Sequence, residues 1–160
     1  MVLEKSKSYL HQCYKMKSTI FFIPGAVPSS KNSRVMTRAG FFIGSKATQK
    51  YRKSSKIYWD KYRDQFRQLI VSEPKPIIIG MHFVRASRHK WDFINPAQTI
   101  QDEMTKNGWI DDDNVDELLP VPLFIDGKYW SYNKSNAGVY IAVLSSFCEG
   151  FDQLQLNETS

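Results

Sequence analysis

Acidic residues gather in one segment of the chain, between Asp92 and Glu117. Asp92 stands alone at its start, and three consecutive aspartates occupy positions 111–113. Magnesium prefers oxygen ligands, and one or two carboxylates commonly hold the ion against a substrate phosphate. Such an ion polarises the phosphoryl oxygen and lowers the pKa of an attacking water. The segment therefore predicts a divalent-metal site acting on a nucleic-acid phosphate, although an exposed turn would also suit an aspartate run.

A basic segment precedes the acidic one. From Lys46 to Arg67 only Asp60 and Asp64 oppose the positive side chains. The whole chain carries a formal net charge of +6, which favours a polyanionic partner. Clustered Lys and Arg are typical of nucleic-acid-binding proteins, and a solvated helix face would give the same pattern. The basic residues of the segment are Lys46, Lys50, Arg52, Lys53, Lys56, Lys61, Arg63 and Arg67.

Hydrophobic periodicity predicts a long basic helix at 46–70 and several strands around it. Ser45 can cap this helix, and its apolar stripe consists of Tyr51, Tyr62, Phe66 and Ile70. The expected strands are 19–23, 77–84 and 138–144, with a hairpin formed by 35–37 and 41–43 and an irregular segment at 111–132.

A second helix at 95–107 should connect Asp92 to the aspartate run. Asn95 fits its N-cap, Gln98 would complete a capping-box-like pair, and Gly108 fits its stop. The apolar residues Ala97, Ile100 and Met104 line one face of it. The order of elements predicts an α+β domain, in which a small mixed β-sheet carries the long basic helix and the second, acidic helix.

The length of the second helix constrains the metal hypothesis. About 12 residues of helix span roughly 18 Å, so Asp92 and Asp112 would lie far apart along a straight axis. They can meet only if Trp109 and Ile110 fold back along the helix or begin a strand beside the central strand at 77–84. Asp102, in the middle of the helix, could bridge the gap or pair with Lys106 on the surface. For Trp91 and Trp109, core packing is expected over base stacking.

Composition excludes several classes of protein. The 160 residues suit one domain, and the charged N-terminus resembles neither a secretory signal nor a membrane span. Cys13 and Cys148 show no zinc spacing and are expected as free thiols in a cytoplasmic protein. The three histidines form neither a triad nor a zinc pattern. Residues 1–17 are expected as a basic extension and 147–160 as a polar tail.

Two segments resemble the RusA family of Holliday junction resolvases, in particular its phage and mobile-element branch. PSSKNSR (28–34) is similar to the family's loop after the first strand. WDFINPAQTIQDEMTKNGWIDDDNV (91–115) is similar to its signature, in which an Asp and an Asn precede a helix with a further Asp, and a Gly, a paired Asp and a Val follow. The resemblance covers roughly 19–143, with 120–135 as an insertion, and implies a RusA-like endonuclease domain at 18–146.

The resemblance implies roles for particular residues. Asp92 and Asp112 would be catalytic metal ligands, with Asp111 as a further ligand and Asp102 in a supporting catalytic role. Asn95 and Gln98 would support the site. The DNA backbone would be held by Lys31, Asn32, Arg34, Lys46, Lys50, Lys53, Arg85, Arg88 and Lys90.

This sequence departs from the family at two positions. Ile94 stands where the best-known members carry a second Asp, and Gln98 stands where they carry a Lys. A neutral Gln cannot stabilise charge on the transferring phosphate as a cation can. Both departures bear on the number of metals and on the rate of cleavage.

The expected function is that of a magnesium-dependent, structure-selective endonuclease. It would resolve four-way DNA junctions by phosphodiester hydrolysis in recombination and repair. Branched DNA and a second copy of the chain are the expected partners, because a two-fold dimer would present two sites to opposed strands. No organic cofactor and no membrane are expected. A branched-DNA-binding protein without cleavage is the alternative, and an RNA-binding module is a third possibility that lacks the usual motifs.

Overall fold

The computed structural model describes residues 14–32 and 34–146, and at 14–18, 32, 34, 145 and 146 it describes the backbone alone. The cysteines at 13 and 148 and the expected tail at 147–160 lie outside these residues. The predicted end of the N-terminal extension at residue 17 is wrong, because the first strand already begins at Tyr14. Residues 14–17 therefore belong to the sheet.

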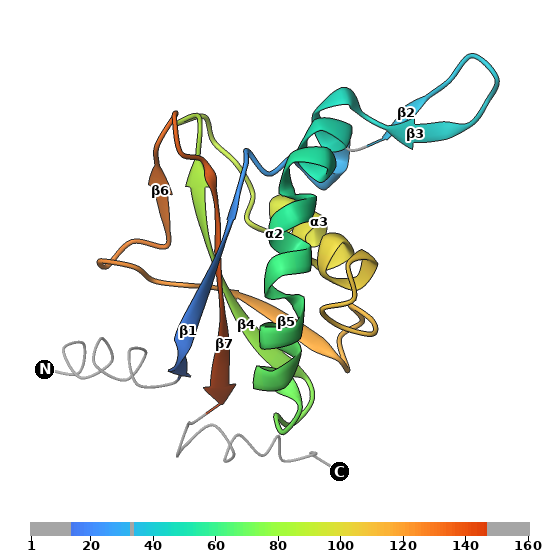
Figure 1. Ribbon diagram of the computed structural model, residues 1–160. Coiled ribbons are helices and arrows are strands. Elements are labelled where there is room, and N and C mark those ends of the chain that lie inside the picture. Colours follow the sequence, from blue (N-terminus) through green and yellow to red (C-terminus); the bar gives the residue numbers. More distant parts are fainter. Residues whose placement is uncertain (1–13, 33, 147–160) are drawn as a thin grey trace, which may run out of the picture.

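The main sheet is mixed, as expected for this α+β class. Its strands are β1 (Tyr14–Pro24), β7 (Gly138–Ser146), β4 (Ile77–Arg85) and β5 (Leu118–Pro122) in that order, and β6 (Trp130–Tyr132) extends the β5 edge along the second half of β4 (Figure 1). The β1–β7 and β7–β4 pairs are antiparallel, whereas β5 and β6 run parallel to β4. A parallel neighbour requires a crossover, and α3 supplies it between β4 and β5.

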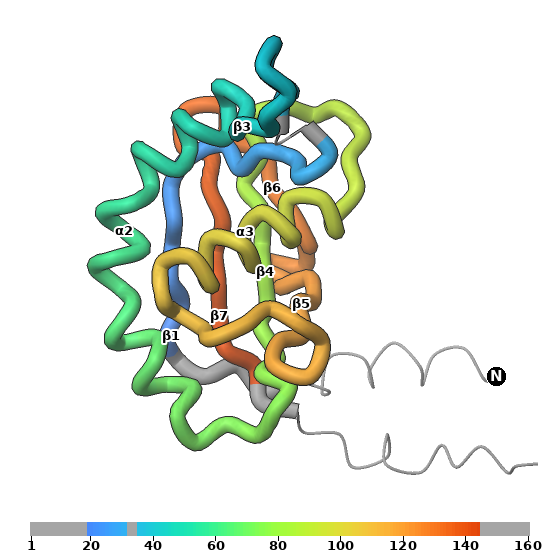
Figure 2. The backbone as a smooth tube through the Cα atoms, turned by 90° about the vertical axis from the view of Figure 1, so that its right-hand side faces the viewer, coloured from blue at the N-terminus to red at the C-terminus, as the bar shows by residue number. Residues whose placement is uncertain are grey.

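Two helices, α2 (Lys46–Ile70) and α3 (Ile94–Lys106), cover one face of the sheet (Figure 2). Successive side chains of a strand point to opposite faces, so β4 sends alternate residues toward the helices. These are Ile77, Ile79, Met81 and Phe83, and all four are buried.

Aromatic side chains dominate the core beneath the helices. Trp59 of α2 and Trp109, which follows α3, meet edge to face with ring centroids 4.9 Å apart. The Trp109 indole N–H donates to the Trp59 carbonyl at 2.8 Å, and Phe21 of β1 packs edge to face on Trp109. The expected core role of Trp109 is confirmed, and its burial fixes where the chain leaves α3.

Helix α2 has the predicted bounds. The Ser45 hydroxyl accepts a hydrogen bond from the Thr48 N–H at 3.3 Å, which confirms it as the N-cap. Tyr51 and Phe66 of the predicted stripe are buried, and Trp59, which the predicted stripe did not include, joins them.

The segment expected to be irregular contains β5 and β6, which corrects the prediction. Pro120 and Pro122 disfavour a strand because proline cannot donate a ladder hydrogen bond. β5 is an edge strand, however, so a missing N–H on its outer side leaves no partner unsatisfied. His82 of β4 helps to hold this segment, since its ring nitrogens bond the Leu123 carbonyl at 3.0 Å and the Ser131 hydroxyl at 3.1 Å.

A small hairpin projects from the body of the molecule. It consists of β2 (Arg34–Met36) and β3 (Phe42–Gly44), preceded by the short helix η1 (Ser30–Asn32). This second sheet confirms the predicted hairpin, and it extends away from the main sheet (Figure 1). Within the described part of the chain, no helix has the length and apolar character needed to cross a membrane.

Candidate functional site

Asp92 lies on the connection between β4 and α3, just before α3 begins. Its carboxylate accepts a hydrogen bond from the Asn95 side-chain amide at 3.2 Å and pairs with the Lys31 ammonium at 3.5 Å. The Asp92 side chain is 71% exposed. An exposed ion pair contributes little to stability, so Lys31 can leave Asp92 for another anion at little cost.

Asp92 borders a cleft of about 520 Å³. The loop after β1, the end of β4 and the start of α3 form its walls. Among the described residues, three positive side chains line it, Lys31, Arg85 and Lys90, together with a single acidic one, Asp92. The cleft is thus a basic surface that contains one carboxylate.

Arg85, at the end of β4, is held in the cleft by aromatic rings. Its guanidinium lies 4.8 Å from the ring centre of Trp91 and 5.8 Å from that of Trp130, and it donates to the His89 carbonyl at 2.6 Å. Partial burial lowers the pKa of Arg85, but an arginine stays charged at any physiological pH. The rings therefore orient a permanent positive charge at the cleft.

The aspartates after α3 lie at the opposite end of that helix. Asp111 pairs with Arg67 of α2 at 3.3 Å. Asp112 accepts hydrogen bonds from the Asn114 side-chain amide at 3.0 Å and from the Asp113 N–H at 2.7 Å, and these bonds lower its pKa. Burial, and then the neighbouring Asp102 carboxylate, raise the pKa of Asp113. Asp102 itself accepts a hydrogen bond from the Gln98 side chain at 3.3 Å.

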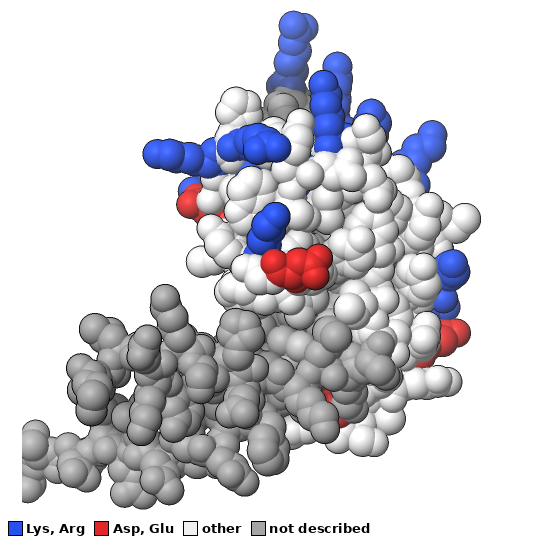
Figure 3. Space-filling view, turned by 90° about the vertical axis from the view of Figure 1, so that its left-hand side faces the viewer, with Lys and Arg blue, Asp and Glu red and all other residues white. Residues whose placement is uncertain are grey.

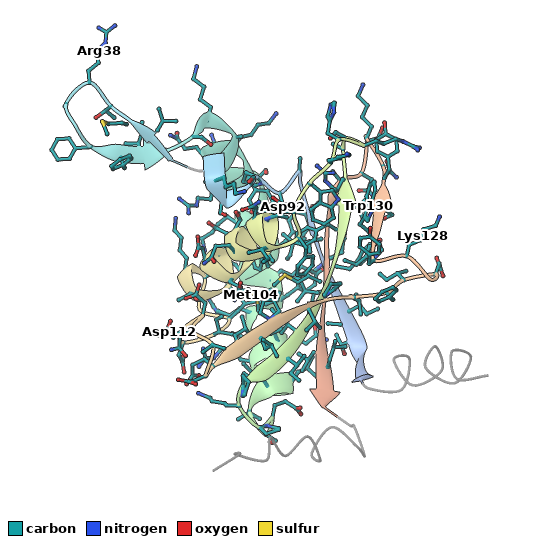
Figure 4. All side chains as sticks on the ribbon, turned by 180° about the vertical axis from the view of Figure 1, so that it is seen from behind. Arg38, Asp92, Met104, Asp112, Lys128 and Trp130 are labelled. Carbon is teal, nitrogen blue, oxygen red and sulfur yellow. The ribbon has the colours of Figure 1, made fainter. Side chains whose placement is uncertain are left out.

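The chain does not bring Asp92 and Asp112 together. The 13 residues of α3 span roughly 20 Å, and the two aspartates lie toward its opposite ends (Figure 4). Trp109 is drawn into the core rather than folding the chain back, so Asp111 and Asp112 stay at the far end. Among the described residues, no group of three or more His, Cys, Asp or Glu side chains is placed to hold a metal ion.

The expected capping role of Asn95 is wrong. Helix α3 begins at Ile94, its N-cap position is Phe93, and no side chain caps it. The Asn95 amide is instead turned toward the Asp92 carboxylate, and Gln98 bonds Asp102 in place of a capping-box partner. The predicted apolar face is confirmed, because Ala97, Ile100 and Met104 are buried.

The side chains at Asp92 offer a magnesium ion one carboxylate and a neighbouring amide as possible ligands. Magnesium keeps several waters and needs only one or two carboxylates when a substrate phosphate completes its shell. The Asp92 carboxylate is exposed, and the Asn95 side chain is next to it. The cleft therefore suits one hydrated ion that arrives with a phosphate, and it does not suit an ion caged by protein ligands alone.

The expected DNA-binding residues gather at the end of the molecule that carries the cleft and the hairpin. Lys and Arg side chains crowd the corresponding end of the face in Figure 3. Lys46, Lys50 and Lys53 are exposed in the first turns of α2, and no ion pair to them exists among the described residues. In the second half of α2, by contrast, Arg63 and Arg67 pair with aspartates. The side chains of Asn32 and Arg34 lie outside the described residues.

The sequence did not point to β6 as part of this site. β6 brings Trp130 beside Trp91 and Arg85, and it brings Tyr132 under the Arg88 guanidinium, 4.4 Å from the ring centre. Its alternation of aromatic residues around Ser131 extends over only three residues, which is too short to indicate a strand. The pairing of β6 with β4 places these rings in the structure.

Comparison with models of known protein families and with curated proteins finds no match for this chain.

Proposed function

We propose that this protein is a magnesium-dependent, structure-selective endonuclease that resolves four-way DNA junctions by phosphodiester hydrolysis. The observation that carries the proposal is the basic cleft, in which the exposed Asp92 carboxylate is surrounded by Lys31, Arg85 and Lys90. The motif resemblance of the acidic segment supports the reaction, and the excess of basic residues supports the polyanionic substrate.

The residues of the cleft have separate tasks in this proposal. Lys31 exchanges Asp92 for a DNA phosphate, while Arg85 and Lys90 neutralise the neighbouring phosphates. Asn95 holds the Asp92 carboxylate in position. A magnesium ion bound by Asp92 would polarise the scissile phosphate and activate the attacking water. Asp102, Asp111 and Asp112 of the same chain do not join this cleft.

A homodimer in the cytoplasm is part of the proposal. Two copies related by a two-fold axis would present two clefts to opposed strands of a junction. The same arrangement would allow Asp112 of a second copy to approach Asp92, which a single chain does not permit.

The test compares Asp92→Asn with Asp112→Asn on labelled four-way junctions, linear duplex and single-stranded RNA with magnesium. We expect Asp92→Asn to lose at least a hundredfold in cleavage while it still binds the junction, because it removes the only carboxylate that the described residues place in the cleft. Full cleavage by Asp92→Asn, or a preference for RNA, would contradict the proposal. Sedimentation of the wild-type protein tests the dimer.

The Asp112→Asn variant determines how the site is assembled. Unchanged cleavage would remove Asp112 from the reaction. Equal loss in both variants would indicate a site shared between copies. A mixture of the two variants would then regain activity, because a mixed dimer contains one intact site. No such recovery is possible if each site belongs to one chain.

The second candidate function is junction binding without cleavage. The separation of Asp92 from Asp112, together with Ile94 and Gln98 at positions where the resembled family carries Asp and Lys, favours it. Tight binding of junctions by the wild-type protein without any nicked product, over a range of magnesium concentrations, would support this candidate over the endonuclease.

A further inference from the structure

The β2–β3 hairpin (34–44) exposes apolar side chains on both of its faces. Val35 and Ile43 form one cross-strand pair, and Met36 and Phe42 form the next, so the two pairs point to opposite faces. All four side chains are exposed, and Phe42 is 64% exposed. A two-stranded hairpin is marginally stable alone, and a projecting apolar surface of this kind marks an interaction site.

The tip of the hairpin has a defined shape. The Thr37 N–H donates to the Phe41 carbonyl at 2.7 Å, and the Phe41 N–H donates to the Thr37 hydroxyl at 3.1 Å. Gly40 closes the turn with a φ of +82°, which glycine adopts without strain. Phe41 is 71% exposed, and Arg38 lies at the far end of the projection (Figure 4). The turn thus presents an aromatic ring and a positive charge together.

Charge identifies the partner of this hairpin. The sequence contains no Asp or Glu between Glu4 and Asp60. The hairpin leads directly into α2, whose first turn contains Lys46 and no acidic residue. A second copy that docked through this end would bring positive charges together, whereas a polyanion would neutralise them. Nucleic acid offers both the negative backbone and the flat apolar bases that exposed aromatic rings can stack on.

We propose that the hairpin inserts Phe41 and Phe42 into the branch point of a DNA junction while Arg38 and Lys46 hold the flanking phosphates. This inference rests on the proposed function, since it supplies the branch-selective contact of the same protein. At a branch point the strands exchange between arms, so the stack lacks the continuous backbone of a duplex and separating its bases costs less than within a duplex. Apolar side chains that enter between bases are a known means of distorting DNA.

The experiment measures binding without cleavage, in calcium instead of magnesium, for the double variant Phe41→Ala/Phe42→Ala. Fluorescence anisotropy gives the affinity for a four-way junction and for a linear duplex that has the sequence of the junction's arms. Stacking on a base contributes on the order of tenfold in affinity or more, so we expect the junction affinity to fall at least tenfold and the duplex affinity to stay within about twofold. A 2-aminopurine at the branch point should brighten with the wild-type protein and not with the variant.

Two further variants serve as controls. Ile57→Ala removes an apolar side chain of α2 that is 69% exposed but outside the hairpin, and it should bind the junction as the wild type does. Phe41→Trp/Phe42→Trp keeps the stacking surface and should retain the preference for the junction. Failure of the tryptophan variant to retain it would contradict stacking.

Several results would overturn the inference. Equal loss of junction and duplex affinity by the alanine variant would mean that the hairpin does not read the branch point. If the wild-type protein is a dimer and the alanine variant is a monomer with unchanged junction affinity, a second copy covers the hairpin.

One result would separate this inference from the proposed function. A wild-type protein that binds the junction selectively through the hairpin but never cleaves it would disprove the endonuclease and leave this inference standing.

Discussion

At the scale of single residues, Lys46 lies where a positive charge does not stabilise its helix. It is the first residue of α2, and the first turn holds no acidic side chain. The N-terminal end of a helix carries a partial positive charge, so a lysine there is unfavourable and an anion is favoured. A DNA phosphate at this end would remove that unfavourable interaction.

Lys46→Glu should therefore stabilise the protein while it weakens DNA binding. We expect the free energy of unfolding in urea to rise by about 0.5–1 kcal/mol, because a carboxylate complements the helix dipole. The affinity for a junction, measured by anisotropy at low salt, should fall severalfold. Lys53→Glu is the matched control: it makes the same charge change beyond the first turn, so it should weaken binding with a smaller gain in stability. A Lys46→Glu variant with full affinity would place Lys46 outside the DNA surface.

At the scale of elements, an ion pair between a partly exposed arginine and a buried glutamate links α2 to α3. The Arg52 guanidinium donates to the Glu103 carboxylate at 2.5 Å, and the Glu103 side chain is 3% exposed. Burial and the same carboxylate raise the pKa of the neighbouring Tyr51. Because α3 begins beside Asp92, this contact also helps to fix one wall of the cleft.

Arg52→Leu should destabilise the protein far more than the loss of a surface ion pair. Without its partner, the Glu103 carboxylate would remain buried and uncompensated, which costs about 3 kcal/mol when one side of the pair is partly exposed. Arg52→Leu/Glu103→Leu should recover most of this loss. Urea unfolding of both single variants and the double variant gives the coupling energy. A double variant that loses the sum of the two single effects would contradict the ion-pair explanation.

At the scale of the whole molecule, charge is divided between two ends. The cleft, the β2–β3 hairpin and the start of α2 form a basic end, whereas Asp111 and Asp112 lie at the other end of α3. In the proposed complex with DNA, each phosphate that this end neutralises would release counterions.

Junction binding should consequently weaken steeply with salt. Each phosphate contact contributes a slope of about −0.9 to log K against log salt concentration. Replacing Lys46, Lys50 and Lys53 by Gln should reduce the magnitude of the slope by roughly 2–3. Lys128, exposed on a loop away from the basic end (Figure 4), is the control, and Lys128→Gln should leave the slope unchanged. A wild-type affinity that hardly changes with salt would contradict phosphate binding by this end.

The sequence by itself determined the local elements of this fold. The bounds of α2, its Ser45 cap, the hairpin and the buried face of α3 follow from periodicity and turn residues, which act over a few residues. It also identified Lys31, Asp92 and Lys90, which share one cleft because they come from adjoining connections.

Tertiary structure alone decided how the acidic segment is divided. Asp92 and Asp112 flank one helix in the sequence, but whether they meet depends on the path of the chain after that helix. Burial of Trp109 against Trp59 holds the chain at the far end of α3, and the strand β5 then begins from there. Pairing with β4 makes an edge strand of a proline-containing segment and, through β6, brings Trp130 to Arg85. These are contacts between residues distant in sequence, which local pattern does not encode.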